Sequence, residues 1–170
     1  MHRFVFPLAL PFVLIATVAA AQPIKTLETG KIWSAYSLPE KGGPTCYLVG
    51  KPTKSTPANA QRSRVDAMVS HRVGEKAYNV VTFNLGYAVK KNTPAEVTID
   101  GKKYVLFLDN DAAWTPNAKT DKTITEALAR GNTAVVKAIS AHGTTTTDTY
   151  DLTGFGQALK AINAACKVKP

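Results

Sequence analysis

The sequence predicts an all-β fold, an antiparallel β-sandwich with two short helices at its margin. About eight short segments have the composition or alternation of β-strands, and clusters of Gly, Pro, Asn and Asp residues separate them. An Asp100-Gly101 turn between two strand-like flanks is a strong local signal for a hairpin. Only two stretches have helical spacing, and short strands that outnumber the helices favour a sandwich.

The first half of the chain contains four expected strands. Residues 22–30 are polar and show no periodicity, so we expect an irregular leading segment there. Prolines and glycines within 39–44 predict a turn, and residues 50–63, which contain two prolines, predict a surface loop. The expected strands are residues 32–36, 46–49, 64–71 and 78–85.

The second half continues with hairpins. Residues 97–107 form the Asp-Gly hairpin, and a polar corner at 109–111 leads to Ala113-Trp114. Residues 133–141 are rich in Val and Ala, turn at His142-Gly143, and return through a strand at 145–152.

Two segments have helical periodicity. Residues 121–130 begin with a predicted capping box of Thr123 and Glu126, and Gly131 is a suitable C-terminal stop. The final helix carries one continuous apolar stripe, which places its last cysteine toward the core. The stripe consists of Phe155, Ala158, Leu159, Ile162 and Cys166.

Residues 1–21 have the pattern of a secretory signal peptide. A basic start at Arg3 precedes an apolar run that ends at Val18, and small residues up to Ala21 form a cleavage site before Gln22. Because the apolar run is short for a bilayer crossing, no transmembrane anchor is expected in the mature form.

We expect the mature chain to form a single β-rich domain, residues 22–170, with its core at about 31–166. Its two cysteines, Cys46 and Cys166, are expected to form one disulfide, because a pair of thiols outside the cytoplasm tends to oxidise. Two buried thiols or a redox pair are the weaker alternatives, since the cysteines have no C-x-x-C spacing.

The net positive charge alone does not determine which partner the protein binds. The whole chain has 21 Lys and Arg against 12 Asp and Glu and a net charge of +9, which loses only Arg3 with the leader. Scattered lysines are typical of a solvated surface, and attraction to an anionic envelope or host-surface component is the sharper alternative. Nucleic acid is not expected as a partner, because no motif combines aromatic with basic residues.

The sequence offers little catalytic chemistry. Ser140, His142 and Asp148 are the residue types of a nucleophile, base and orienter, but no G-x-S-x-G elbow surrounds the serine. Residues 109–111 offer oxygen ligands without the spacing of a calcium loop, so a turn is expected. Zinc ligands and a phosphate-binding glycine loop are also missing, and we therefore expect a binding or structural module with no cofactor.

Aromatic side chains are the candidates for a binding surface. We assign to it, together with His142, the residues Trp33, Tyr36, Tyr87, Trp114 and Tyr150, although core packing also explains most of these aromatics. The threonines at 144–147 are expected to be strand residues whose hydroxyls could line a polar groove.

A series of short motifs resembles the invasion-associated locus B family of Gram-negative bacteria. The motifs, in order, are Trp33-Ser34-Ala35-Tyr36, Cys46-Tyr47, Gly86-Tyr87, Asp111-Ala112-Ala113-Trp114, Ser140-Ala141-His142-Gly143-Thr144, Thr147-Asp148-Thr149-Tyr150, and the helix that ends in Cys166. The resemblance spans about residues 31–166.

This resemblance implies an exported protein that is periplasmic, associated with the outer membrane or cell surface, or secreted, with a link to virulence in some pathogens. It implies no catalytic residues, and hence a non-catalytic protein that binds an envelope or host-surface component. The alternatives are a small periplasmic hydrolase that uses the hairpin of His142 and Asp148, and a structural protein of the envelope stress response.

Overall fold

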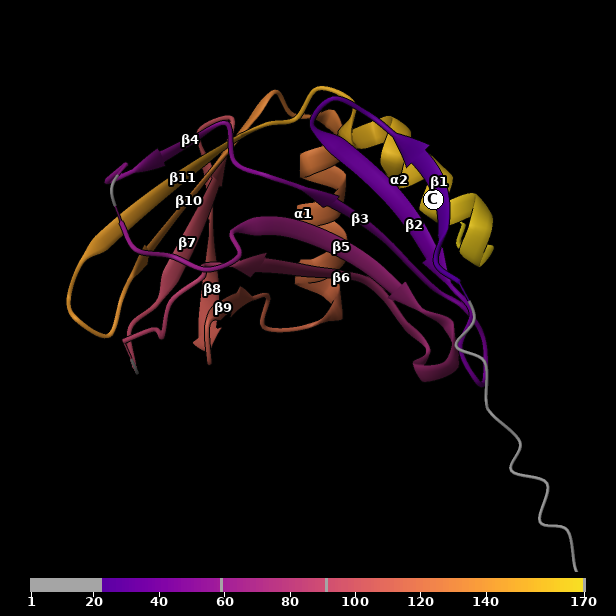
Figure 1. Cartoon of the computed structure of the whole chain (residues 1–170), viewed down its shortest axis with the longest axis horizontal. Helices are drawn as coiled ribbons and strands as arrows, with labels where there is room; N and C mark the ends of the chain where they lie inside the picture. The colour runs from indigo at the N-terminus through magenta and orange to yellow at the C-terminus, as the bar shows by residue number, and fades with distance from the viewer. Residues whose placement is uncertain (1–22, 59, 91, 170) are drawn as a thin grey trace, which may run out of the picture.

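Antiparallel strand pairing dominates the architecture (Figure 1). The computed structural model describes residues 23–58, 60–90 and 92–169, so the predicted leader, residues 1–21, lies outside the described residues. The strands are β1 (Lys25–Thr29), β2 (Trp33–Leu38), β3 (Thr45–Gly50), β4 (Lys54–Thr56), β5 (Asp66–Arg72), β6 (Ala77–Asn84), β7 (Ala95–Ile99), β8 (Lys102–Asp109), β9 (Ala112–Trp114), β10 (Thr133–Ile139) and β11 (Thr145–Asp151). The helices are α1 (Ala118–Arg130) and α2 (Phe155–Cys166), with a 3-10 turn, η1 (Val73–Glu75). The predicted all-β class is confirmed.

The sandwich is one continuous sheet that curves over on itself. Its order is β1-β2-β3-β5-β6-β9-β8-β7-β10-β11-β4. Strand β8 belongs to both parts, because its first residues pair with β7 and its last residues pair with β9. We call β1-β2-β3-β5-β6-β9 half-sheet A and β7-β10-β11-β4 half-sheet B.

Large aromatic side chains hold the two half-sheets together. Trp33 of β2 lies 6.3 Å from Tyr150 of β11 between ring centroids, and its Nε1 donates to the carbonyl oxygen of Asp151 at 2.8 Å. The same indole meets Phe155 of α2 edge to face at 4.9 Å, and Phe83 of β6 lies 6.1 Å from Tyr150. The inner faces of the two half-sheets therefore share one core.

Gly50 allows Trp33 to take this position. The two residues face each other across β2 and β3, and a Cβ on Gly50 would lie 2.5 Å from the indole ring. Because the Trp33 ring occupies the space that a side chain at residue 50 would need, glycine is required there for close packing.

Helix α1 covers an open edge of β6. Strand β9 pairs only with Thr82–Asn84, so the earlier part of β6 has no strand partner on that side. Asp121 of α1 accepts the backbone N–H of Val81 at 2.8 Å, and the Thr125 hydroxyl donates to the carbonyl of Asn79 at 3.3 Å. Burial raises the pKa of Asp121. Helix side chains thus replace two missing strand hydrogen bonds.

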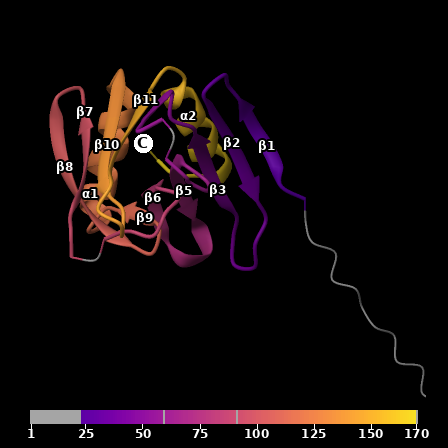
Figure 2. The same cartoon turned by 60° about the vertical axis from the view of Figure 1, so that its left-hand side comes forward.

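Helix α2 packs against β1, β2 and β3, as Figure 2 shows. Its expected stripe is buried at Phe155, Ala158, Ile162 and Cys166. Neither helix in the described part of the chain combines the length and the hydropathy needed to cross a membrane.

Three local predictions were wrong. The leading segment contains β1, whose residues are half-buried or exposed because it is an edge strand, so no periodicity marked it. The loop at 50–63 contains the short strand β4. Helix α1 begins earlier than expected, capped by the Asn117 side chain, while the Thr123 hydroxyl donates to a backbone carbonyl within the helix. The predicted stop at Gly131 is confirmed.

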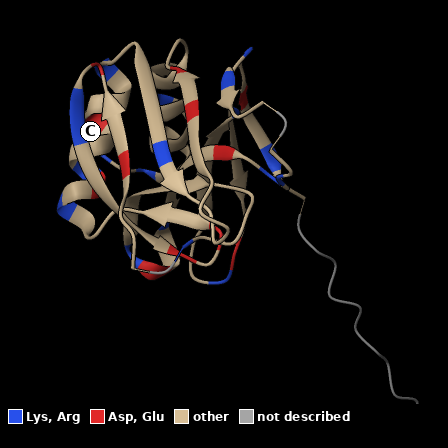
Figure 3. Cartoon of the chain, turned by 90° about the vertical axis from the view of Figure 1, so that its left-hand side faces the viewer, with Lys and Arg blue, Asp and Glu red and all other residues tan. Residues whose placement is uncertain are grey.

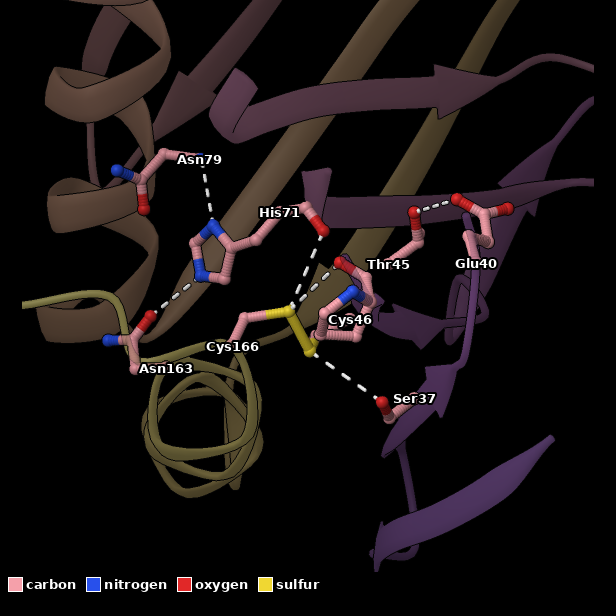
Figure 4. The surroundings of a disulfide bond; sticks show 9 residues. Ser37, Glu40, Thr45, Cys46, His71, Asn79, Asn163 and Cys166 are labelled. Atoms are coloured by element: carbon pink, nitrogen blue, oxygen red, sulfur yellow. Dashed lines mark hydrogen bonds between the residues drawn. A yellow bond between two sulfur atoms is a disulfide. The ribbon is translucent and has the colours of Figure 1, made fainter. Parts of the chain in front are cut away.

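The predicted disulfide is present. Cys46 of β3 and Cys166 at the end of α2 are bonded across a sequence separation of 120 residues (Figure 4). Both cysteines are buried, with exposed fractions of 0% and 6%. The bond fixes the last turn of α2 to the centre of half-sheet A.

A buried histidine lies beside this bond (Figure 4). His71 Nδ1 accepts the backbone N–H of Asn79 at 3.0 Å, and Nε2 lies 2.7 Å from Asn163 Oδ1. Because Nδ1 is an acceptor, the ring is neutral with its proton on Nε2, which donates to Asn163. Burial lowers the pKa of His71.

Removal of the disulfide is expected to lower the free energy of unfolding. Cys46→Ala with Cys166→Ala frees a long loop in the unfolded chain, and the expected loss is about 2–5 kcal/mol. Urea unfolding of the oxidised protein and of the double variant measures the difference. An unchanged midpoint would contradict a stabilising role.

Acidification is expected to destabilise the fold through His71. The unfolded chain binds a proton on this residue below about pH 6.5, whereas the folded chain resists it, so stability falls as the pH drops below that value. His71→Gln should flatten the pH dependence of the unfolding free energy between about pH 7 and pH 5. His142→Gln, at an exposed position, is the control and should keep the wild-type slope.

Candidate functional site

A groove of about 610 Å³ lies where β2 begins, β3 ends and β5 begins. The β1–β2 turn, the segment that leaves β3 and the start of β5 surround it. Its lining residues are Gly30, Lys31, Ile32, Ser34, Tyr36, Val49, Gly50, Lys51, Pro52, Thr53, Arg64 and Asp66. We call it the basic groove, because three of these residues are cationic and one is acidic.

The local charges are partly compensated. Asp66 is buried, pairs with Arg64, and accepts a hydrogen bond from the side-chain amide of Asn84 at 2.7 Å. Hydrogen bonds from Thr153 lower the pKa of Asp151, and the charge of Lys31 adds to that effect. The side chain of Arg64 is 66% exposed, so its charge remains accessible at the groove although it pairs with Asp66.

A tyrosine pair borders the groove. Tyr36 and Tyr47 are directly opposite each other on β2 and β3, and their rings stack at 5.3 Å with an interplanar angle of 29°. Tyr36 lines the groove itself. The alternation that buries Ala35 and Leu48 in the core points these two rings to the opposite, outer face of the sheet.

The aromatic residues predicted to form one surface are separated. Trp33 and Tyr150 are 2% and 1% exposed and belong to the core, so this part of the prediction was wrong. Trp114 pairs with Phe107 of β8 on a different part of the sheet. Tyr87 and His142 line a second cavity, described below, which shares no lining residue with the basic groove.

An ion pair that the sequence did not indicate lies beneath that second cavity. Arg62 donates from Nη1 and Nη2 to the two carboxylate oxygens of Asp148 at 2.7 and 2.6 Å, and from Nε to the carbonyl of Leu85 at 2.8 Å. Ser55 also donates to Asp148 at 2.7 Å. Both charged side chains are buried, with exposed fractions of 6% and 1%. Arg62 and Asp148 are 86 positions apart in the sequence, and no motif connects them.

Comparison with family models identifies the family of this chain. The model described as "Invasion associated locus B (IalB) protein" matches residues 33–163, which is most of the chain. The chain belongs to the IalB family. Comparison with curated proteins and with solved structures gave no match. The matched region begins at β2 and includes most of the basic groove, and the resemblance drawn from the sequence is confirmed.

The printed family description names no reaction, and the serine–histidine–aspartate trio of this IalB protein is not assembled. Asp148 is occupied by Arg62 and Ser55, and Ser140 Oγ accepts the backbone N–H of Thr144 at 3.1 Å. His142 is exposed, and within the described residues its ring makes no hydrogen bond to either partner. The relay that a hydrolase needs is therefore missing from this geometry.

The polar corner at 109–111 forms the turn between β8 and β9, with Asn110 at a φ of 54°. Throughout the ranges that the structure describes, no group of three or more His, Cys, Asp or Glu side chains is placed to hold a metal ion.

Breaking the buried ion pair is expected to be costly. Arg62→Ala leaves the Asp148 carboxylate buried without its partner, which should cost about 3–5 kcal/mol of unfolding free energy. Replacing both residues, with Arg62→Met and Asp148→Leu, should recover most of that loss, because no uncompensated charge remains.

The exposed pair of Arg130 and Glu126 on α1 is the matched control for this experiment. Arg130→Ala should change the unfolding free energy by at most about 0.5 kcal/mol. Equal losses for the buried and the exposed arginine in thermal or urea unfolding would contradict the assignment.

Proposed function

We propose that this IalB-family protein is exported and binds an anionic component of the bacterial envelope or of a host surface through the basic groove. The observation that carries the proposal is the groove itself, whose lining contains the three cations Lys31, Lys51 and Arg64 and one buried carboxylate, Asp66. Clustered cations around a concave surface attract polyanions and raise their local concentration.

Two features support export. Residues 1–21 combine a basic start, an apolar run and small residues before Gln22. The Cys46–Cys166 disulfide is of the kind that persists in oxidising compartments.

The distribution of charge favours a local site over a general one. Figure 3 shows Lys and Arg on many elements with Asp and Glu among them. Exposed charges that are dispersed in this way are largely screened at physiological salt. The groove differs because it places cations around one hollow.

The tyrosine pair favours a partner that contains sugar rings. Stacked aromatic rings beside a groove offer a flat apolar surface with polar edges, and cations at the same site suit phosphate or carboxylate substituents. An anionic glycolipid or polysaccharide, such as lipopolysaccharide, has both chemistries.

Charge reversal in the groove is expected to weaken this binding. Lys31→Glu with Lys51→Glu should weaken retention on purified lipopolysaccharide by at least about tenfold at low salt, and the wild-type binding should itself decline as salt rises. Lys119→Glu with Lys160→Glu makes the same change in net charge on the two helices and is the matched control. Equal losses in both double variants would mean that only the overall charge matters.

Export is tested on the natural chain. The protein recovered from the periplasmic or extracellular fraction should begin at Gln22 and have the mass of the disulfide form. Recovery of the uncleaved chain with free thiols from the cytoplasm would contradict this part of the proposal.

A further inference from the structure

A second cavity, of about 380 Å³, lies between three separate parts of the chain. The segment that follows β4 forms one wall, Tyr87 after β6 forms another, and the turn between β10 and β11 forms the third. The lining residues are Pro57, Ala60, Gln61, Arg62, Tyr87, Ser140, His142, Thr144 and Thr146. We call it the hydroxyl pocket, because four of these side chains carry a hydroxyl group.

The charge in the pocket is compensated within the protein. The Arg62 guanidinium, which lines the pocket, is bound through both terminal nitrogens to the carboxylate of Asp148. Asp148 itself does not line the pocket. An anionic ligand would meet a guanidinium whose charge Asp148 already compensates, and a cationic ligand would be repelled by the guanidinium. The pocket therefore offers no net charge to attract either.

Two of the hydroxyl groups are hydrogen-bonded to each other, and two others remain able to bind a ligand. Tyr87 Oη lies 2.5 Å from Thr146 Oγ1, and the tyrosine ring lies under the Arg62 guanidinium at 5.2 Å from its centroid. Ser140 Oγ accepts a backbone N–H, so its own proton remains to be donated. Thr144 is exposed at the mouth, where its hydroxyl can both donate and accept.

The strand register produces this arrangement. In β11 the buried residues Thr146, Asp148 and Tyr150 alternate with half-buried ones, so one face of the strand presents Thr146 to the pocket and Asp148 to Arg62. Thr147 lies on the opposite face, outside the pocket.

The guanidinium adds donors to the pocket. Arginine carries five N–H groups. Three are used in bonds to Asp148 and Leu85, and the remaining two make no hydrogen bond to any residue that the structure describes.

We propose that the hydroxyl pocket binds an uncharged saccharide unit. Sugar hydroxyls are donors and acceptors at once, which complements the hydroxyls of Tyr87, Ser140 and Thr144, the amide of Gln61 and the free guanidinium N–H groups. The volume is at the lower end of the range of small-molecule sites, which suits one sugar ring or a short branch.

Neutral methyl glycosides are the probes that test this site. The methyl glycosides of glucose, galactose, mannose and N-acetylglucosamine are titrated against the folded protein by saturation-transfer-difference NMR and by amide chemical shifts. At least one should bind and shift the amides of Thr144 and Tyr87. Glucuronate and glucose 6-phosphate, which add a negative charge to the same ring, should bind more weakly.

Two threonine variants test whether binding depends on a hydroxyl of the pocket or on any hydroxyl in this part of the chain. Thr144→Val removes an exposed hydroxyl at the mouth and should weaken glycoside binding by about fivefold, while Thr147→Val on the opposite face should leave it unchanged. Tyr87→Phe should weaken binding at least as much, with thermal unfolding to confirm that the variant is folded.

The proposal is overturned if no neutral glycoside binds, if the charged sugars bind more tightly, or if the two threonine variants behave alike. Because the two sites share no lining residue, Lys31→Glu with Lys51→Glu should leave glycoside binding intact. Failure of the basic groove to bind a polyanion is therefore distinguishable from failure of this pocket.

Discussion

The packing of Trp33 between the two half-sheets is the interaction on which the rest of the structure depends. Its ring contacts Tyr150 of half-sheet B and Phe155 of α2, and its indole N–H is satisfied by the carbonyl of Asp151. Tryptophan buries a large apolar area, and an acceptor for its indole N–H removes the cost of burying that polar group. This one residue therefore joins the two ends of a sheet that would otherwise be open.

The disulfide stabilises the same region at the opposite end of α2. Cys166 fixes the end of α2 to β3, while Phe155 at the start of α2 packs against Trp33. The helix is thus held at both ends against half-sheet A, and the neutral His71 beside the disulfide bonds to Asn163 of the same helix. Stability of this end of the molecule is consequently tied to both oxidation and pH.

The segment between β3 and β5 contributes residues to both candidate binding sites. The basic groove forms where the chain leaves β3 and returns at β5, and the hydroxyl pocket forms where that same connecting segment passes Tyr87 and the β10–β11 turn. The basic groove carries three cations against one carboxylate, whereas the hydroxyl pocket places its single arginine in a buried ion pair.

Local patterns and composition were sufficient to predict several features of this protein. The Asp100-Gly101 hairpin, the amphipathic stripe of α2 and the pairing of two cysteines follow from turn chemistry, helical periodicity and redox chemistry. The edge strands β1 and β4, the ion pair of Arg62 with Asp148 and the division of the aromatic residues between core and surface were decided by tertiary structure. Each of these depends on which strand lies beside which. The contacts of β4, of the ion pair and of Trp33 with Tyr150 join residues 86 or more positions apart, which leaves no periodic signal in a single sequence. Strand β1 pairs with the nearby β2, but as an edge strand it has no buried face that would produce an alternating pattern.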